Sequence, residues 1–369
     1  YFLELVAFPT FFPINHQLDI QKKNWSSPPG DHLVCNGPFK LKKWLPQTEI
    51  LFVKNPTYWD HQAVHLDRIV FSVISNSYTE SHLFEKGELD WLGQPLSNNI
   101  TPEILGRLKE KGDLESYAVT GTCWLKFNTE KEPFNDAKLR TAFSYAINRQ
   151  EIITHLLQGN QSIATGPVPP SLVDKEAPYF KDGDVAQARR LFEEVLFEQG
   201  WTLLSFPKIV LNYSPTERTI KIVQLVQQQW KAAFGIDVEL VSLENHLYRR
   251  TVRQGLYQVG LGDWIADFQD PLAFLELFKY RNDVKTGNGM NDTGWQNEAF
   301  IALLDESQSE HDLKKREVLL NTAEMILVQE MPIAPIYHYA FDYVKKPYVQ
   351  NVLLSPHGTA DFKTTQLVH

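Results

Sequence analysis

The most informative stretch for the fold is residues 209–267, which read IVLNYSPTERTIKIVQLVQQQWKAAFGIDVELVSLENHLYRRTVRQGLYQVGLGDWIAD. Apolar and β-branched residues predict strands at 209–211, 236–243 and 257–261, and residues 215–234 between the first two have the period of a helix. A strand–helix–strand–helix–strand order predicts a parallel α/β unit with right-handed crossovers.

The segment Gly262–Asp267 follows the third strand directly. Sheets of this kind bind ligands beyond the carboxyl ends of their strands, so the segment is the first place to look for a site. Asp270 precedes Pro271 and an apolar run, which is typical of a helix N-cap followed by proline. Asp263 and Asp267 as the paired carboxylates of a hydrolase are an alternative, although nothing nearby indicates a bound water.

Asp267 has no structural role that its neighbours explain. It lies among apolar residues, and no lysine or arginine occurs within nine residues before it or eleven after it. A carboxylate with little access to water is costly unless it is paired. Two explanations stay open: a basic partner from elsewhere in the chain, or a cationic group of a ligand such as an ammonium.

Composition narrows the class of protein. With 369 residues, 43% hydrophobic and 22% charged, the chain has the composition of two or three globular domains. The net charge of −9 argues against nucleic acid or anionic lipid as the main partner. No apolar run reaches the 18 or so residues of a membrane span. The 45 aromatic residues suit a ligand cleft as well as a core.

Motifs for catalysis, metal binding or cofactor binding are absent. The sequence contains no Gly-x-Ser-x-Gly, no His-Glu-x-x-His and no phosphate-binding glycine loop, and its histidines are scattered. Cys35 and Cys123 lack metal-ligand spacing and form either one disulfide or two inert thiols. We therefore predict a protein that is not an enzyme, with no metal and no cofactor.

Outside the central stretch the sequence predicts further elements. Residues 39–44 and 50–53 read as a hairpin, and residues 114–119 and 124–128 as two strands. Four more helices are expected, at 79–86, at 102–111, from Asp136 to Leu157 with Gly159 as its C′ residue, and from Asp184 to Gly200.

Six motifs in order extend the analysis to nearly the whole chain. They are NGPFKLKKW at 36–44, KNPTYW at 54–59, GELD at 87–90, the segment 127–149 with FNT, PFND and AINR, DWIADFQDP at 263–271, and PIAPIY at 332–337. Together they resemble the oligopeptide-binding proteins of bacterial ABC transporters, a branch of the family 5 solute-binding proteins.

The resemblance implies an α/β, two-lobed periplasmic-binding-protein fold (type II, cluster C-like) with parallel sheets in each lobe, which close on the ligand by a hinge. It assigns residues 1–18 to the end of an accessory domain, 19–120 to lobe one, 121–335 to lobe two and 336–369 to a return into lobe one. The first residues, Tyr1-Phe2-Leu3, have no signal-peptide features, so we expect a piece of a longer exported protein whose accessory domain is mostly missing.

The resemblance also implies a binding site. Asp267 matches the aspartate that binds the α-ammonium of the peptide, and the main chain of Asp263 and Ile265 is expected to pair with the peptide backbone. Trp264 and Ala266 belong to the same segment, and Tyr337 is expected to line the cleft. Main-chain pairing would let one site accept many side chains.

This sequence departs from the family pattern at several positions. Ile265 stands where close members carry a cysteine, so the family disulfide to the region of Cys123 is not expected. Leu261 and Val252 stand where arginines receive the peptide carboxylate in close relatives. Arg253 and Arg218 are the nearby basic residues that can substitute for them.

The predicted function is therefore oligopeptide capture in an interlobe cleft and delivery to an inner-membrane ABC permease. The predicted form is a monomer, periplasmic or anchored as a lipoprotein on the outer side of the inner membrane. The alternative keeps the fold with another ligand: a dipeptide, a cell-wall peptide, a metal chelate, haem, or a sugar stacked on Trp264.

Overall fold

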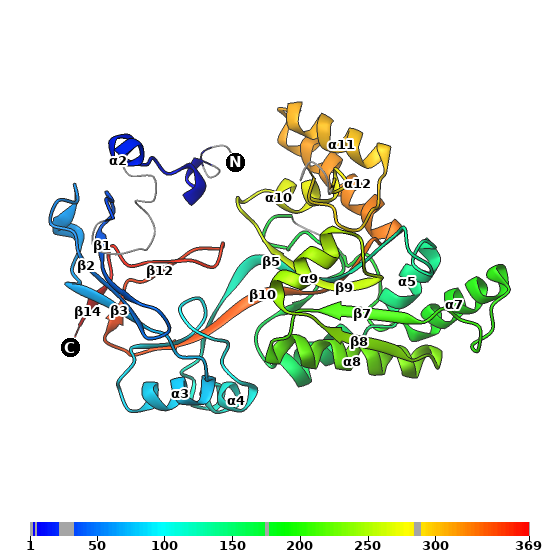
Figure 1. Ribbon diagram of the computed structural model, residues 1–369, viewed down its shortest axis with the longest axis horizontal. Helices are drawn as coiled ribbons and strands as arrows, with labels where there is room; N and C mark the ends of the chain where they lie inside the picture. Colours follow the sequence, from blue (N-terminus) through cyan, green and yellow to red (C-terminus); the bar gives the residue numbers. More distant parts are fainter. Residues whose placement is uncertain (1–2, 4–5, 22–32, 174–176, 284–288, 369) are drawn as a thin grey trace. The chain divides into compact units, whose positions relative to one another are not determined.

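The computed structural model describes residues 3, 6–21, 33–173, 177–283 and 289–368 (Figure 1). The chain forms two compact units. The first comprises Ala118–Ala340, and the second comprises the described parts of Phe2–Tyr117 and Phe341–His369. The chain passes between the units twice, within strands β5 (Glu115–Phe127) and β10 (Ile333–Lys345).

The first unit is built on a mixed sheet, in which strands follow the order β10-β5-β9-β7-β8, and β6 pairs with β10. The strands besides β5 and β10 are β6 (Ser162–Ile163), β7 (Ile209–Tyr213), β8 (Val238–Ser242) and β9 (Val259–Ile265). β7 is parallel to both β8 and β9, which confirms the predicted parallel α/β unit, and β9 is antiparallel to β5. Instead of the two short strands expected at 114–119 and 124–128, β5 is continuous.

Helices surround this sheet (Figure 1). They are α5 (Ala137–Tyr145), α6 (Arg149–Glu151), the π-helix η3 (Ile152–Leu157), α7 (Val185–Gln199), α8 (Glu217–Phe234), α9 (Asn245–Arg253), α10 (Leu272–Leu275), the 3₁₀ helix η4 (Glu276–Phe278), α11 (Glu298–Ser309) and α12 (Leu313–Glu330). Asp184 caps α7, and Gly200 and Gly235 end α7 and α8 in the left-handed conformation, as predicted.

The single helix predicted from Asp136 to Leu157 is wrong. The chain leaves the helix after α5, and Asn148 starts a new one by accepting a hydrogen bond from the Glu151 amide. Gln158, not Gly159, adopts the left-handed conformation at the end of η3. The break places the side chain of Arg149 in the core, where it bonds to residues that are distant in the sequence.

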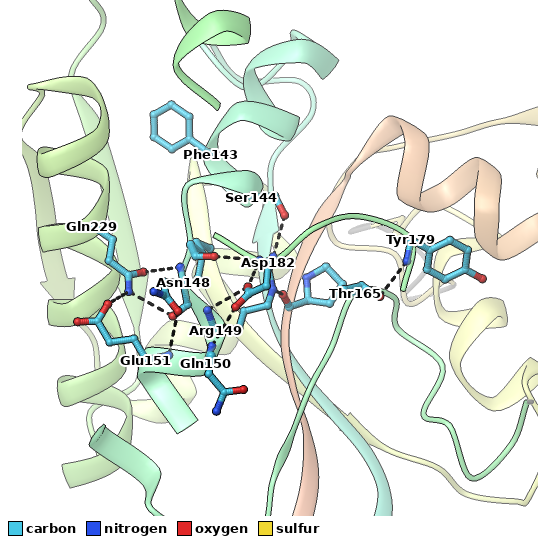
Figure 2. Close-up of polar contacts among 12 residues, drawn as sticks. Phe143, Ser144, Asn148, Arg149, Gln150, Glu151, Thr165, Tyr179, Asp182 and Gln229 are labelled. Atoms are coloured by element: carbon cyan, nitrogen blue, oxygen red, sulfur yellow. Dashed lines mark hydrogen bonds and ion pairs between the residues drawn. The ribbon is translucent and has the colours of Figure 1, made fainter. Parts of the chain in front are cut away.

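Arg149 is fully buried and hydrogen-bonded on every side (Figure 2). Its Nε donates to the Pro335 carbonyl at 2.6 Å, Nη2 to Ser144 Oγ at 2.9 Å, and Nη1 to the Ile147 carbonyl at 3.1 Å and to Asp182 at 3.2 Å. One side chain therefore ties α5, α6 and the loop around Asp182 to β10.

A hydrophobic cluster joins α10, α11 and α12 to the sheet of this unit. Phe274, Phe300, Leu304, Ala323 and Leu327 from α10, α11 and α12 pack with Trp124 of β5 and Ala266 after β9. Burial of this apolar surface fixes the end of β9 and the residues after it against the helices.

The second unit contains an antiparallel sheet in the order β1-β2-β3, so the expectation of parallel sheets in both lobes is wrong here. The connection between β1 and β2 is a tight turn, too short for the crossover that parallel strands need. The helices and strands of the second unit are η1 (Pro9–Phe11), α2 (His16–Gln21), β1 (Phe39–Leu45), β2 (Glu49–Lys54), η2 (His61–Ala63), β3 (Arg68–Ser72), α3 (Ser77–Glu85), β4 (Trp91–Gly93), α4 (Pro102–Lys111), β11 (Val349–Gln350), β12 (Leu353–Leu354), β13 (Ala360–Asp361) and β14 (Gln366–Leu367).

The expected segment boundaries at 120–121 and 335–336 fall inside β5 and β10. Residues 1–2, 4–5 and 22–32 of the first two expected segments lie outside the described residues, and the assignment of segments to lobes stays a prediction. Among the helices of the described ranges, none is long and apolar enough to cross a membrane.

Candidate functional site

Strand β9 directs its main-chain groups alternately to its two edges. The Asn128 amide donates to the Gln258 carbonyl, and the Ala266 amide donates to the Thr120 carbonyl. Even-numbered residues of β9 therefore face β5, and the odd-numbered ones, Leu261, Asp263 and Ile265, face the opposite edge.

That opposite edge is covered by β7 along part of its length. The pairing runs from Leu211 beside Val259 to Asn212 beside Gly260, and β7 ends at Tyr213. In the described part of the chain, no strand pairing on this edge continues past Gly260. The amides and carbonyls of Asp263 and Ile265 thus lie at a strand edge that another extended chain can join.

The side chain of Asp263 belongs to a polar cluster on one face of the sheet. Tyr339 donates its hydroxyl proton to Asp263 Oδ2 at 3.1 Å, and the Arg218 guanidinium lies 5.4 Å from the centre of the Tyr339 ring. Tyr337, next on the same face of β10, hydrogen-bonds with Tyr339 and Cys123. Cys123 is the direct cross-strand partner of Asp263.

Electrostatics distinguish the members of this cluster. Tyr337, followed by Tyr339, Cys123 and Asp263, raises the pKa of Arg218 above its usual range, because these groups are negative when ionised. Burial raises the pKa of the Cys123 thiol to about 12 and also raises the pKa of Tyr337 and Tyr339. At neutral pH the cluster therefore has a cationic Arg218, neutral tyrosines and a neutral thiol.

Gly121 makes the tight packing of this cluster possible. A Cβ at this position would lie 2.9 Å from Cδ2 of Tyr339 and 3.0 Å from Cγ1 of Ile265. The absence of a side chain thus lets the Tyr339 ring lie directly against β5, beside the end of β9.

On the other face, Trp264 packs against the hydrophobic cluster of α10–α12, and its indole Nε1 is a buried donor with no partner among the described residues. Asp267 follows in the bend after β9 and is partly buried. Asp270 anchors this bend: its carboxylate pairs with Arg316 at 2.8 and 2.9 Å and accepts a hydrogen bond from the Leu272 amide at 2.9 Å. The N-cap of α10 is Pro271, so Asp270 lies one residue before the N-cap, the position predicted for it.

Comparison with known proteins agrees with this geometry. The family model described as bacterial extracellular solute-binding proteins, family 5 Middle, matches residues 1–286. This chain belongs to family 5 of the bacterial extracellular solute-binding proteins. The predicted family resemblance is confirmed.

Two curated relatives of this family 5 chain come from Bacillus subtilis (strain 168). The chain is 41% identical over 367 residues to the oligopeptide-binding protein OppA, covering 98% of this chain and 66% of OppA. It is 31% identical over 370 residues to the dipeptide-binding protein DppE, covering 98% of this chain and 65% of DppE. The chain thus spans about two thirds of the length of these relatives.

Among solved structures, a periplasmic oligopeptide-binding protein (OppAIV) from Borrelia burgdorferi matches with a TM-score of 0.85 at 25% identity, over 100% of this chain and 71% of the other. The predicted α/β periplasmic-binding-protein fold is confirmed.

The structure of the family 5 chain brings most of the predicted site residues together. Asp263, Trp264, Ile265, Ala266 and Asp267 are consecutive at the carboxyl end of β9. Arg218, at the start of α8, and Tyr337, on β10, belong to the polar cluster around Asp263.

Arg253 lies elsewhere. It ends α9, and its carbonyl accepts a hydrogen bond from Asn282. The next residues reach the amino end of β9, where Asn128 binds the carbonyls of Gly255 and Tyr257. Arg253 is thus at the opposite end of the strand from Asp263, whereas Arg218 belongs to the polar cluster that contains Asp263.

Sequence reasoning missed Tyr339 and the position of Cys123 in the cluster. It also missed Tyr248, whose hydroxyl donates to the Leu261 carbonyl of β9. Tyr339 could have been predicted from the sequence, because residues i and i+2 of a strand share a face and Tyr337 was already a candidate. Cys123 and Tyr248 depend on which strands become neighbours, and the sequence carries no local signal for that. Both cysteines are free thiols: Cys123 is buried and Cys35 is exposed.

Proposed function

We propose that this protein is the peptide-capturing, non-enzymatic component of an ABC transporter. The observation that carries the proposal is the edge of β9, where the main-chain groups of Asp263 and Ile265 extend past the end of β7. An extended peptide that adds to this edge gains hydrogen bonds without any requirement on its side chains.

Charged groups at the two ends of this edge give the peptide a direction. Asp267, just past the strand, is the proposed partner of the α-ammonium, and a cationic ligand group next to a partly buried carboxylate is favourable. Arg218 is the proposed partner of an anionic group further along the peptide, such as its carboxylate. Tyr339 orients Asp263 through its hydroxyl group and lies against Arg218, and Tyr337 is proposed to line the same site.

Membership of a family of extracellular solute-binding proteins supports a site of action outside the cytoplasmic membrane. The relatives named as oligopeptide- and dipeptide-binding proteins support a peptide ligand and a binding role without catalysis. Delivery to an inner-membrane permease, a monomeric state and a lipoprotein anchor are parts of the same proposal.

Isothermal titration with a peptide pool tests the proposal. We expect free peptides to bind and their N-acetylated forms to bind at least about 30-fold more weakly, because one partner of a desolvated charge pair is removed. Asp267→Asn is expected to weaken free peptides by a similar factor and to make the protein indifferent to acetylation.

Asp237→Asn serves as the matched control, because Asp237 is exposed and pairs with Lys231 away from the site. This variant is expected to bind like the wild type. Equal affinity of the wild type for free and acetylated peptides contradicts the role of Asp267. Absence of heat with every peptide contradicts the proposed function as a whole.

A further inference from the structure

The open edge of β9 ends abruptly at Leu261. The carbonyl of Leu261 faces the same edge as Asp263 and Ile265, one step before them along the strand, and it lies where β7 has already ended its pairing. This carbonyl accepts a hydrogen bond from the hydroxyl of Tyr248, which comes from α9.

The surroundings are built to hold that hydroxyl in place. Tyr248 is 9% exposed and packs in a cluster with Val252, Tyr257 and Leu243. A Cβ on Gly260 would lie 2.8 Å from the Tyr248 hydroxyl, so the glycine leaves the space that the hydroxyl fills. Burial raises the pKa of Tyr248, so the group is a proton donor at neutral pH.

We infer that Tyr248 determines how many residues of a bound peptide pair with β9: it occupies the Leu261 carbonyl and so ends the edge after Asp263. The inference rests on the proposed function, in which a peptide pairs with this edge. It names a specificity-determining residue and a ligand class, namely peptides whose backbone is read over about three residues.

The number three follows from strand geometry. Residues of an added strand face their partner alternately, so if peptide residue 1 lies beside Ile265, residue 3 lies beside Asp263 and residue 5 would reach Leu261. The Tyr248 hydroxyl lies against the Leu261 carbonyl, in the space that the amide of residue 5 would have to enter, so this amide is expected to gain no hydrogen bond there. Longer peptides are accepted only if their later residues leave the edge.

An N-methyl scan of penta-alanine tests this directly, since an N-methyl group removes one backbone donor. For the wild type we expect N-methylation at residue 3 to weaken binding about fivefold or more, the value of one hydrogen bond, and N-methylation at residue 5 to change it less than about twofold. In Tyr248→Phe the Leu261 carbonyl is free, and N-methylation at residue 5 is expected to weaken binding about fivefold.

Tyr257→Phe is the matched control. Tyr257 is buried in the same cluster, and its hydroxyl also donates to a main-chain carbonyl, that of Asp292 at 2.8 Å, away from the β9 edge. It loses the same atom, so its thermal unfolding shows what the loss of a buried hydroxyl does to the fold alone. It should keep the wild-type response to both methylated peptides.

The outcomes separate the inference from the function on which it rests. Sensitivity at residue 3 in all three proteins with no sensitivity at residue 5 in Tyr248→Phe overturns the role of Tyr248 and leaves peptide pairing intact. Insensitivity at both residues in all three proteins overturns backbone pairing with β9 and the inference with it.

Discussion

Two arginines lie beside aromatic rings in the first unit, and their surroundings differ. Arg149 is 4.8 Å from the ring centre of Phe180, and Arg218 is 5.4 Å from that of Tyr339. Arg149 donates to three groups of the chain and pairs with Asp182. For Arg218, no ion pair or hydrogen bond to another described residue is present.

The difference indicates two uses of the same side chain. Nε, Nη1 and Nη2 of Arg149 each donate to an acceptor of the chain, as a buried charge requires. Burial lowers its pKa to about 10, and it stays charged at neutral pH. Arg218 instead keeps its donors unused among groups that raise its pKa, at the carboxyl end of the parallel strands. Arg149 therefore stabilises the fold, whereas Arg218 contributes no hydrogen bond to the described part of the fold.

Replacing Arg149 gives the largest expected effect. Arg149→Met removes the guanidinium donors of the Pro335 carbonyl and of Ser144 Oγ. It also removes the cation that pairs with Asp182, which within the described chain keeps only the main-chain amides of Arg149 and Gln150 as donors. We therefore expect the free energy of unfolding to fall by about 3–5 kcal/mol. Urea denaturation followed by circular dichroism measures it. Arg190→Met, at an exposed i,i+4 pair with Glu194, is expected to change stability by less than about 1 kcal/mol. A similar loss in both variants contradicts the structural role of Arg149.

Replacing Arg218 is expected to affect ligand rather than fold. Arg218→Met should change the free energy of unfolding by no more than about 1 kcal/mol without ligand, because no hydrogen bond within the described chain is lost. Its affinity for a short peptide with a free carboxylate should fall about 10- to 100-fold, the value of a charge-assisted hydrogen bond.

A peptide amide distinguishes the source of the anion. If Arg218 reads the terminal carboxylate, amidation weakens binding to the wild type and has no effect on Arg218→Met. If it reads an acidic side chain, substitution of that side chain has this effect instead. Unchanged affinity of Arg218→Met for all these peptides contradicts a ligand role for Arg218.

The sequence was sufficient for elements with strong local signals and insufficient where distant residues decide. Helix α8, with Thr216 before it and Gly235 after it, is specified by its own residues. The break after α5 is not specified locally, because the apolar periodicity of the sequence continues through Leu157. In the fold the break accompanies the burial of Arg149, which donates to the Pro335 carbonyl, 186 residues away in the sequence. Strand β5 was predicted as two strands, 114–119 and 124–128, but it is continuous in the fold, and Gly121 between these two segments gives room to Tyr339.

The site follows the same division. Asp263 to Asp267 are consecutive, so their place near the carboxyl end of a parallel strand was predictable from the chain order alone. The strand extends to Ile265, further than the predicted end at residue 261. That β9 outruns β7, and that Tyr248 bonds to Leu261, depends on the register of two strands and the placement of α9. Nor could Arg253 and Arg218 be separated without the fold, because only tertiary structure puts them at opposite ends of β9.

At neutral pH the smallest effect is expected for Cys123, whose thiol interacts electrostatically with Arg218. Burial raises the pKa of this thiol to about 12, and Arg218 acts in the opposite direction. In the native protein at pH 8 we expect iodoacetamide to modify exposed Cys35 and not Cys123, with one adduct by mass spectrometry before denaturation and two after it. Modification of both thiols in the native protein contradicts the burial of the cluster.

The same shift predicts a dependence of stability on pH with a defined sign. The thiol loses its proton near pH 9 in the unfolded chain and near pH 12 in the fold, so its contribution is fully present below pH 9 and is lost as the pH rises from 9 to 12. The slope from this one group is at most about 1.4 kcal/mol per pH unit. Cys123→Ser lacks the thiol and should lose stability less steeply from pH 9 to pH 12, whereas Cys35→Ser should follow the wild type.

Arg218→Met removes the cation that favours the thiolate, so Cys123 in this variant should keep its proton to still higher pH. An identical slope in Cys123→Ser and the wild type would show that the thiol is not held neutral by the fold.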